Sequence, residues 1–429
     1  MDIENWDWDI GKRKIADFSV WQERFSYLEE PYATPDGESI AAIVRNDEEE
    51  FTVSTQKSDQ EIKVWENAYD KIWNLRYGPD ARLSALISDT GEWSVSTDDT
   101  PWANTFDFVW DMTTTSRGEH LAVSVQKDLK YAAAVNDTPW TTSFSRLTSM
   151  TLSPDGLHSA AVVETEPLLE TEIFKFRKGC YSVAVDGKAW KESFMNVWEP
   201  CFSSNGTHTA ASVRTNYLDY TIAVDGKVWK KNYRSVWAPV FSPATDAVVA
   251  PVKEDGQWTL ADKDGAIWNT SFYQLWHPVF AGEGNSIWAI VSPKYGLWTV
   301  ALDGKTWDAK FNELVTDLSL SLDGQRAGCV FKHDGKWGIA VDGKPWQGRF
   351  DMAWKPVFCP DATHVAAKVE INGRYTLVID GTVLDRKFTR LEMPVFSRDG
   401  KRLLIRGIEK NIFYREIIDL GQLSVQTSG

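Results

Sequence analysis

A tryptophan with an aromatic residue four positions later recurs at a constant interval along this chain. Five such tryptophans follow one another at intervals of 39 residues: Trp190, Trp229, Trp268, Trp307 and Trp346. The same register continues upstream through Trp140, Trp102 and Trp65, and downstream to Leu384. A fixed period of this kind is the sequence signature of a repeat architecture. The 429 residues therefore form repeats of one structural unit rather than three unrelated domains.

Each repeat contains four short segments with the patterns of β-strands. An apolar run ends in a turn such as Pro154-Asp-Gly156, where Pro fixes φ and Gly supplies a positive φ. A strand rich in Ala and Val follows, and then an alternating strand that ends in Asp-Gly, which is the strongest short hairpin signal. The Trp-x-x-x-Phe segment is the fourth. Four short strands in about 40 residues are typical of a propeller blade.

Ten first strands can be counted, but the last repeat lacks its own fourth segment. The first strands lie near Tyr32, Arg76, Thr114, Leu152, Phe202, Phe241, Phe280, Leu320, Phe358 and Phe396. The C-terminal repeat has strands only at residues 394–397, 403–407 and 414–420, whereas the N-terminus carries an unpartnered fourth segment. We therefore predict an all-β fold, a β-propeller of about ten four-stranded blades. The N-terminal strand from Trp21 to Phe25 completes the last blade and closes the ring, which removes exposed sheet edges.

The expected domain organisation follows from this count. Residues 1–17 form an N-terminal tail, residues 18–420 a single β-propeller, and residues 421–429 a C-terminal tail. An insertion at residues 164–179 explains the one long interval, between Trp140 and Trp190. The alternative is two smaller rings that share the repeats, with this insertion as the seam between them.

The charge of the chain argues against one class of function. It has 46 basic and 61 acidic residues, which gives a net charge of −15. An acidic chain is poorly suited to a phosphate backbone, so we expect no nucleic-acid partner. The N-terminal residues lack signal-peptide features, and no apolar run approaches the roughly 18 residues of a membrane span. We therefore expect a cytoplasmic protein without direct membrane insertion.

No residue pattern indicates a cofactor, a metal or a catalytic centre. The cysteines form no Cys-x-x-Cys pair and are expected to be isolated buried thiols: Cys180, Cys201, Cys329 and Cys359. Four histidines share one position in separate repeats, where they are expected to bond turns rather than to hold a metal: His120, His158, His208 and His364. We expect no cofactor, no metal and no catalytic residue, and we favour an accessory subunit over an enzyme.

Nineteen of the 22 tryptophans fall into three positions of the repeat. Nine belong to the Trp-x-x-x-Phe segment, six precede the next first strand, and four open a third strand. A residue that recurs once per repeat is most simply explained by packing between blades. The remaining three, Trp6, Trp8 and Trp288, are candidates for docking a partner protein. Trp288 is notable because other repeats have alanine at its position.

The insertion at residues 164–179 is a second docking candidate. Its acidic half carries Leu168 and Leu169, and its basic half carries Phe174 and Phe176. Insertions into a regular repeat are often found on the binding face. This amphipathic segment is therefore expected to contact a partner, and the alternative is an ordinary solvated loop.

The turn and the Ala/Val strand of each repeat resemble the WD40-like propeller repeats of the TolB type. A more specific resemblance is to the tryptophan-rich WD40-like subunit of the transmembrane electron-transfer (Tmc-type) complex of sulfate-reducing bacteria. It depends on the Asn5-Trp-Asp-Trp start, the segment from Trp21 to Phe25, the Glu30-Pro-Tyr-x-x-Pro-Asp-Gly37 turn and the tryptophan-dense repeats. In that family the cofactors belong to companion subunits, namely an iron–sulfur protein, a membrane cytochrome b and a multihaem cytochrome c.

This resemblance implies a non-catalytic scaffold or docking subunit of a membrane-associated electron-transfer complex. Such a subunit would be cytoplasmic and would reach the inner membrane only through its redox partners. Two alternatives remain open. One is a propeller enzyme or small-ligand binder that uses its central channel, and the other is a generic protein-interaction platform.

Overall fold

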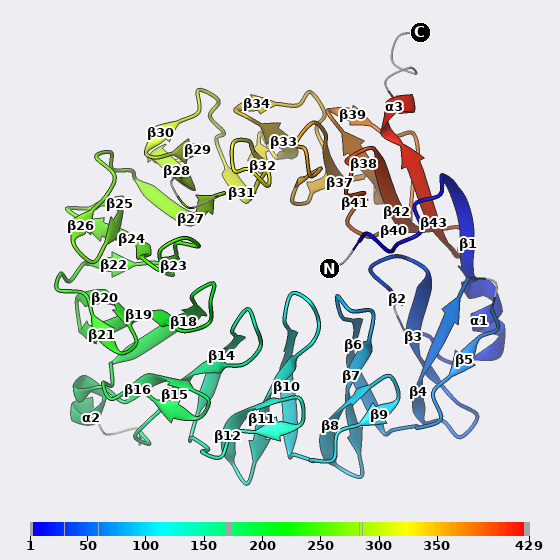
Figure 1. Cartoon of the computed structure of the whole chain (residues 1–429), viewed down its shortest axis with the longest axis horizontal. Helices are drawn as coiled ribbons and strands as arrows, with labels where there is room; N and C mark the ends of the chain where they lie inside the picture. Colours follow the sequence, from blue (N-terminus) through cyan, green and yellow to red (C-terminus); the bar gives the residue numbers. More distant parts are fainter. Residues whose placement is uncertain are drawn as a thin grey trace. The chain divides into compact units, whose positions relative to one another are not determined.

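The computed structural model confirms an all-β, ten-bladed propeller of four-stranded antiparallel sheets (Figure 1). It describes residues 3–29, 31–58, 60–168, 173–282, 284 and 286–423. The chain divides into two compact units: Met1–Ala68 with Ala281–Gly429 is unit 1, and Tyr69–Phe280 is unit 2. The helices are short: α1 (Phe18–Arg24), α2 (Ile173–Lys178) and α3 (Leu420–Leu423). Within the described ranges, no helix has the length and hydropathy needed to cross a membrane.

Five sheets of unit 2 follow one another along the chain. The first two contain β6 (Lys71–Tyr77), β7 (Leu83–Asp89), β8 (Glu92–Thr97) and β9 (Thr100–Pro101), then β10 (Phe108–Thr114), β11 (Leu121–Lys127), β12 (Lys130–Val135) and β13 (Thr138–Pro139). The next two contain β14 (Leu147–Leu152), β15 (Ser159–Glu164), β16 (Tyr181–Val185) and β17 (Lys188–Ala189), then β18 (Asn196–Phe202), β19 (Thr209–Asn216), β20 (Asp219–Val224) and β21 (Lys227–Val228). The fifth contains β22 (Ser235–Val236), β23 (Val240–Phe241), β24 (Val248–Glu254), β25 (Gln257–Asp262) and β26 (Gly265–Ala266).

The boundary between the units falls in the sheet that contains β27 (Gln274–Ala281), β28 (Ser286–Lys294), β29 (Leu297–Leu302) and β30 (Lys305–Thr306). Unit 1 begins with β2 (Tyr32–Ala33), β3 (Ser39–Arg45), β4 (Phe51–Lys57) and β5 (Lys63–Val64). It continues with β31 (Leu314–Leu320), β32 (Ala327–His333), β33 (Lys336–Val341) and β34 (Lys344–Pro345). The two last sheets contain β35 (Met352–Ala353), β36 (Val357–Phe358), β37 (Val365–Ile371), β38 (Arg374–Ile379) and β39 (Thr382–Val383), then β40 (Arg390–Leu391), β41 (Val395–Phe396), β42 (Arg402–Glu409), β43 (Ile412–Asp419) and β1 (Gly11–Asp17).

The Trp-x-x-x-Phe segment, with Leu384 in place of Trp in one blade, forms a discontinuous outer strand in every blade except the last, whose outer strand is β1. In the sheet of β18 to β21, the N–H of Trp229 donates to the Ile222 carbonyl at 2.9 Å. Tyr233 then returns to the sheet through an isolated bridge with Tyr220. The preceding turn has Asp225 at a φ of 48° and Gly226 at 79°, which is the left-handed geometry of an Asp-Gly hairpin. The sequence pattern therefore marks the outer strand of every blade but the last, as predicted.

The first strand of a blade is interrupted where the repeat places a tryptophan. In β18 the pairing with β19 shifts register between Trp198 and Cys201, and Glu199 has a φ of 48°. This is a β-bulge, in which one extra residue re-aims the neighbouring side chains. In the next blade Pro239 follows the tryptophan, and the first strand is divided into β22 and β23. Pro200 stands at the same position of β18, which stays continuous, so proline alone does not divide the strand.

An N-terminal strand completes the last sheet, as predicted, but it is not the expected segment. β1 pairs with β43, beside which it lies in Figure 1, in the order Gly11↔Ile417 to Asp17↔Ile412. This strand comes from the stretch that we expected to be a tail, at residues 1–17. The prediction of a strand from Trp21 to Phe25 is wrong, because Trp21 lies on α1 and Phe25 follows its last residue.

Local capping and burial explain the helix at this position. The Asp17 carboxylate accepts the Ser19 N–H at 3.1 Å, which is a helix N-cap. Phe18 and Trp21, one turn apart, are both buried and lie on the same side of α1. The similarity of this segment to Trp-x-x-x-Phe therefore reflects one buried helical face and not an outer strand.

Two buried arginines hold the last sheet against the first repeat, inside unit 1. We call them the arginine clasp. Arg406 on β42 donates to three carbonyl oxygens, those of Thr34, Pro35 and Met393. Arg415 on β43 donates to the carbonyl oxygens of Asp36 and Asp7 and lies 2.9 Å from the Glu38 carboxylate. Burial lowers the pKa of both guanidinium groups, and these acceptors offset that desolvation.

The core consists of apolar clusters between successive sheets. In one of them, Ala210 and Ile222 from one sheet pack with Val248, Ala250 and Val252 from the next. Trp229 belongs to this cluster and is only 6% exposed. Each sheet thus buries its faces against its neighbours, which is how stacked repeats stabilise one another.

Candidate functional site

The two tryptophans of the N-terminal segment lie against the last sheet of unit 1. Trp6 and Trp8 stack with ring centroids 6.1 Å apart and planes 20° from parallel, and both are half-buried. The Trp8 carbonyl accepts a hydrogen bond from Arg402 at 3.0 Å, and the indole N–H of Trp8 donates to the Ile3 carbonyl. These contacts fix the segment to the blade, and each ring keeps part of its surface for a partner.

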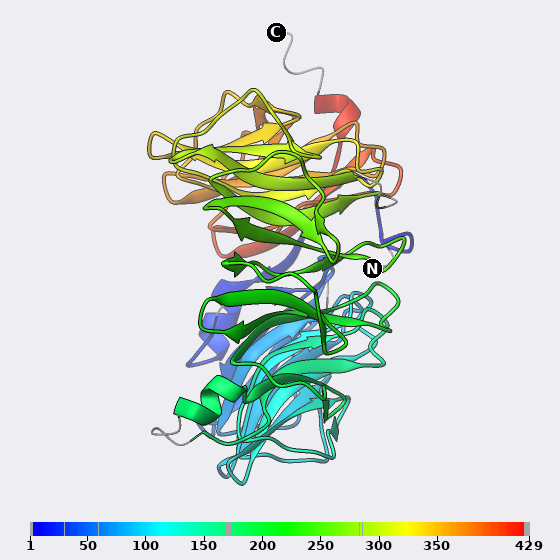
Figure 2. The same ribbon diagram turned by 90° about the vertical axis from the view of Figure 1, so that its left-hand side faces the viewer.

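The insertion contains α2 and lies at the periphery of unit 2 in both ribbon views (Figures 1 and 2). Phe174 is 74% exposed, whereas Phe176 and Leu168 are half-buried. Leu169, also predicted to dock a partner, lies outside the described residues. The guanidinium carbon of Arg177 lies 5.3 Å from the Tyr217 ring centroid, so α2 rests partly on the hairpin between β19 and β20. Ile173, which is 58% exposed, and Phe174 are the apolar side chains that this helix presents to solvent.

Trp288 occupies the interior of its blade. It is 5% exposed, and its indole N–H donates to the Gly324 carbonyl at 3.1 Å. Its ring meets the edge of Trp307, with centroids 6.1 Å apart. A Cβ on Gly324 would lie 2.5 Å from the Gly282 nitrogen, so glycine at both positions lets the two loops approach closely. Among the candidate docking residues, Trp288 has little surface to offer a partner.

A different set of tryptophans is exposed. We call Trp73, Trp110, Trp198, Trp237 and Trp276, all at the first-strand position of unit 2, the tryptophan row. Three are largely open to solvent, Trp73 at 54%, Trp198 at 40% and Trp237 at 45%, and the other two are half-buried. The prediction that recurrent tryptophans pack between blades is wrong for these three. It is confirmed for Trp229 and Trp268 of the outer strand, which are buried.

A bulge of the first strand accompanies four of the five tryptophans of the row, and Trp237 instead lies between β22 and β23. Asn74, Asp111, Glu199 and His277 each follow a tryptophan of the row and have φ values between 48° and 53°. Asn, Asp and Gly tolerate this conformation best, so a polar residue after Trp is the sequence signal that could have revealed the bulge.

Two members of the row lie flat on aromatic residues of the third strand. Trp198 stacks on Tyr220 with centroids 6.1 Å apart, and Trp237 stacks on Trp258 at 5.5 Å with planes 10° from parallel. One face of each indole is therefore covered from below while the ring stays exposed. Such a ring is pre-positioned and loses little side-chain freedom when a partner binds.

Two tryptophans of the row, Trp237 and Trp276, line an apolar cleft of about 340 Å³. Its lining comes from β18, the segment between β22 and β23, and β27: Glu199, Trp237, Ala238, Val240, Trp276, His277, Pro278 and Val279. The aromatic and aliphatic groups form its walls, and Glu199 and His277 are exposed. An apolar centre with exposed polar groups beside it is the usual anatomy of a protein-binding surface, and tryptophan is enriched at binding hot spots.

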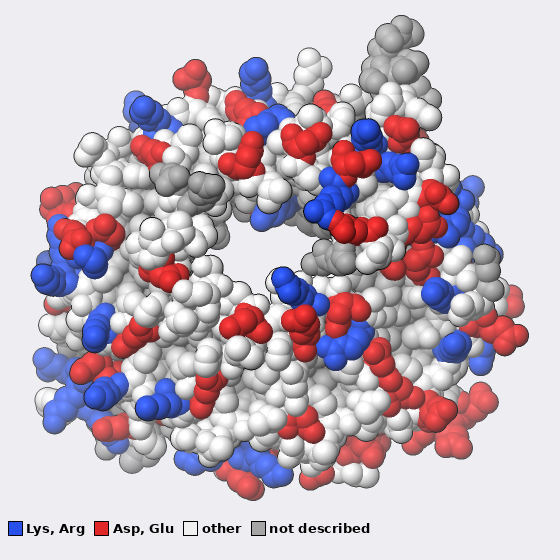
Figure 3. All heavy atoms as spheres, viewed as in Figure 1, with Lys and Arg blue, Asp and Glu red and all other residues white. Residues whose placement is uncertain are grey.

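On the face drawn in Figure 3, acidic side chains gather along the lower right edge, and basic and acidic side chains are interspersed over the rest. Steering of a highly charged partner needs an extended field of one sign. Apolar contact through the row is therefore a better basis for recognition than long-range attraction.

The repeated histidines bond hairpin turns, as expected. Nδ1 of His158 lies 2.6 Å from Asp186, and His208 and His364 pair in the same way with Asp225 and Asp380. The second carboxylate oxygen of each aspartate accepts the first N–H of a second strand, for example that of Thr209 at 2.9 Å. Each pair thus joins two turns of one blade, which is a structural role.

The cysteines are free thiols. Burial raises the pKa of Cys180 to about 11 and that of Cys201 to about 12, so both are protonated and unreactive at neutral pH. Burial also raises the pKa of Cys329 and Cys359. In the part of the chain that the structure describes, no three His, Cys, Asp or Glu side chains are grouped as a metal would need.

Comparison with known proteins adds similarity of fold. No protein-family model matches the chain, and no curated protein matches its sequence. A crystal structure of a eukaryotic initiation factor is 11% identical, with 77% of this chain and 90% of that chain covered and a TM-score of 0.48. The β-propeller domain of Cps50 (Swd1) from Myceliophteria thermophila is 12% identical, covers 63% of this chain and 96% of its own, and has a TM-score of 0.31. TolB from Acinetobacter baumannii is 13% identical, covers 72% and 78%, and has a TM-score of 0.30. Identities this low transfer no function.

Proposed function

We propose that this chain is a non-catalytic docking subunit that binds a partner protein through the tryptophan row of unit 2. The observation that carries the proposal is the exposure of Trp73, Trp198 and Trp237, at 40% to 54%, together with an apolar cleft that Trp237 and Trp276 line. Large exposed apolar side chains grouped on one surface mark interaction sites. A repeated fold that presents the same residue type from blade to blade suits a protein-interaction platform.

We further propose that the partner is a redox subunit of a membrane-associated electron-transfer complex. The companions would be an iron–sulfur protein, a membrane cytochrome b and a multihaem cytochrome c. The support is the resemblance of the tryptophan-dense repeats and of the N-terminal segment with Trp6 and Trp8. In this proposal the chain holds no cofactor, is cytoplasmic and reaches the inner membrane only through these partners.

Co-purification from the native organism tests both parts. The tagged chain is isolated from gently solubilised membranes, and the eluate is examined by haem absorbance and mass spectrometry. We expect haem-bearing and iron–sulfur polypeptides in constant proportion to the chain. Recovery with partners that lack redox cofactors would contradict the redox complex but leave the platform intact. Recovery as a lone monomer would contradict both.

A further inference from the structure

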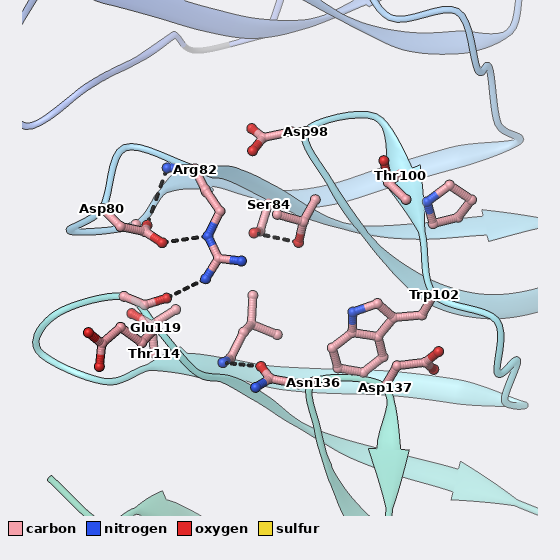
Figure 4. A pocket seen from close by; sticks show the side chains of 15 residues that line it. Asp80, Arg82, Ser84, Asp98, Thr100, Trp102, Thr114, Glu119, Asn136 and Asp137 are labelled. Carbon is pink, nitrogen blue, oxygen red and sulfur yellow. Dashed lines mark hydrogen bonds and ion pairs between the residues drawn. The ribbon is translucent and has the colours of Figure 1, made fainter. Parts of the chain in front are cut away.

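A second, chemically different cleft lies between two consecutive sheets of unit 2, those of β6 to β9 and β10 to β13 (Figure 4). We call it the polar cleft. It has a volume of about 470 Å³, within the range of roughly 300–1,000 Å³ typical of small-molecule sites. The side chains that matter for its chemistry are Asp80, Arg82, Asp98, Trp102, Glu119 and Asp137.

The repeat changes at this cleft. Most blades have Asp-Gly in the hairpin before the outer strand, usually followed by Lys, but these two blades have Asp98-Asp-Thr100 and Asn136-Asp-Thr138. Asp99 and Asp137 both have a φ of 66°, where the other blades use glycine. In each of these two hairpins, aspartate replaces the glycine and threonine replaces the lysine. The change introduces a carboxylate and a hydroxyl group. Two neighbouring blades thus share one departure from the pattern, and the cleft lies between them.

Asp137, which stands where other hairpins have glycine, changes the contact between neighbouring blades. In the next blade interface, a Cβ added to Gly187 would lie 3.2 Å from the Cβ of Trp140, so glycine there rests on the tryptophan. Asp137 instead reaches across to the preceding blade, where its carboxylate accepts the Ala103 N–H at 2.8 Å and the Asn104 N–H at 3.1 Å. This carboxylate is therefore already engaged and holds one wall of the cleft in place.

In the described part of the chain, hydrogen-bond acceptors without a partner remain elsewhere in the polar cleft, on Asp98 and Glu119. In four other blades both oxygens of the equivalent hairpin aspartate are bonded, namely those of Asp186, Asp225, Asp342 and Asp380. Asp98 accepts the Leu83 N–H at 2.8 Å, but Arg82 turns away to Asp80 at 2.5 Å and to the Gly118 carbonyl at 2.6 Å. One oxygen of Asp98 and the whole carboxylate of Glu119 have no hydrogen bond or ion pair within the described ranges.

Hydrogen-bond donors also line the polar cleft. Figure 4 shows the guanidinium of Arg82 and the indole nitrogen of Trp102 turned toward the cleft. The Trp102 indole N–H makes no hydrogen bond within the described residues, whereas that of Trp140 donates to a serine hydroxyl at 2.8 Å. Ser84, which is 6% exposed, and Thr97 share one hydrogen bond at 2.9 Å, so one of their two hydroxyl protons is left for another acceptor.

This mixture of groups defines the ligand. An anion would meet the carboxylates of Asp98 and Glu119. A cation would pair with these carboxylates but would leave the Trp102 indole N–H and the spare hydroxyl proton of Ser84 or Thr97 without an acceptor. A hydroxyl group both donates and accepts, so a ligand with several hydroxyls satisfies every group in the cleft. We propose that the polar cleft binds a neutral polyhydroxylated ligand, a sugar residue that is either free or the end of a longer chain.

Ligand-observed NMR and titration calorimetry on the purified full-length chain test this site. The probes are glucose, galactose, N-acetylglucosamine and a trisaccharide of each, with putrescine and inorganic phosphate as charged probes. We expect saturable binding of at least one sugar, without competition from either charged probe. Equal affinity for a monosaccharide and its trisaccharide indicates a free sugar as the ligand, whereas tighter binding of the trisaccharide indicates a chain end.

Two conservative variants connect binding to the cleft. Trp102→Phe removes the indole N–H, and Glu119→Gln replaces an exposed, unpartnered carboxylate. Each is expected to weaken sugar binding about five- to tenfold, the usual effect of losing one hydrogen bond. The control is Trp307→Phe, at the same repeat position of another blade, which should leave binding unchanged. Thermal unfolding of each variant shows that it is folded.

Three results would overturn the proposal. One is that no sugar of the panel binds saturably. Another is that putrescine or phosphate binds in place of a sugar. The last is that sugar binding is unaffected by both cleft variants. Because the purified chain is used alone, failure here is distinguishable from failure to find a protein partner.

Discussion

At the scale of single residues, one hydroxyl or thiol and one carboxylate hold the turn between the first and second strands. Ser153 donates to Asp155 at 2.5 Å, and in the next-to-last blade the Cys359 thiol donates to Asp361 at 2.8 Å. The hydrogen bond from Cys359 is the main reason why the pKa of Asp361 falls from 3.8 to about 2. The pKa of Asp155 is lowered in the same way by Ser153.

These turns predict a loss of stability in acid. A carboxylate with a lowered pKa stabilises the fold above its unfolded pKa, and this stabilisation is lost as the pH falls through the folded pKa. For Asp361 this stabilisation is lost as the pH falls from 3.8, the usual pKa of the group, to about 2, its pKa in the folded chain. The melting temperature should therefore fall between pH 4 and pH 2. Asp361→Asn keeps an acceptor oxygen but does not titrate, so its melting temperature should fall less.

Asp385→Asn is the matched control, because Asp385 is exposed and has no hydrogen bond within the described ranges. Its melting temperature should follow that of the parent chain at every pH. An equally steep fall in the Asp361→Asn variant would show that this turn does not contribute to the acid transition.

Single residues were also where the sequence predicted least. Trp198 and Trp229 recur with the same period, yet one is 40% exposed and the other 6%. Periodicity identifies that a residue is repeated, but the side of the strand on which it lies depends on the bulge at Glu199. The polar cleft escaped notice for a similar reason, because its groups meet only when two blades are adjacent.

At the scale of elements, turn chemistry made the strands predictable. All ten first strands lie where the apolar runs before the turns placed them, from β2 near Tyr32 to β41 at Phe396. The N-terminal element was mispredicted because β1 reads Gly-Lys-Arg-Lys-Ile-Ala-Asp, which has little strand pattern of its own. Its conformation is imposed by pairing with β43, and sequence-local propensity cannot report such a tertiary contact.

The arginine clasp predicts that one side chain stabilises the junction of the last sheet with the first repeat. Arg406→Ala removes one donor from the carbonyls of Thr34, Pro35 and Met393, and within the described ranges only the Thr34 carbonyl keeps another, the Gly37 N–H at 2.9 Å. Loss of the partner of a buried polar group costs about 1–3 kcal/mol, so the free energy of unfolding should fall by about 2 kcal/mol or more. Denaturant unfolding measures this loss, and hydrogen exchange should show faster exchange in β1 and residues 34–38.

Arg374→Ala removes an exposed arginine of β38 and should change the unfolding free energy by less than about 0.5 kcal/mol. Equal losses in the two variants would mean that Arg406 acts through general charge and not through its three carbonyl contacts.

At the scale of the whole molecule, the repeat defined the fold but not the function. Ten sheets of one pattern follow from the period of the chain, because every blade buries its faces against others of the same kind. Function depends on departures from that pattern, such as the exposed tryptophan row and the Asp-Asp hairpin beside the polar cleft. Departures of this kind become interpretable only when the exposure of each residue is known.

The most direct test of the docking role measures how much partner protein the chain retains on purification from native membranes. The double variant Trp198→Ser, Trp237→Ser removes two exposed indoles of the row. The control, Leu157→Ser, Leu322→Ser, removes two leucines that are 69% and 80% exposed but lie outside the row. We predict that the control retains partner as the parent chain does, and that the row variant retains less than about a tenth, as loss of hot-spot tryptophans implies. Equal retention by all three folded proteins would contradict docking through the tryptophan row.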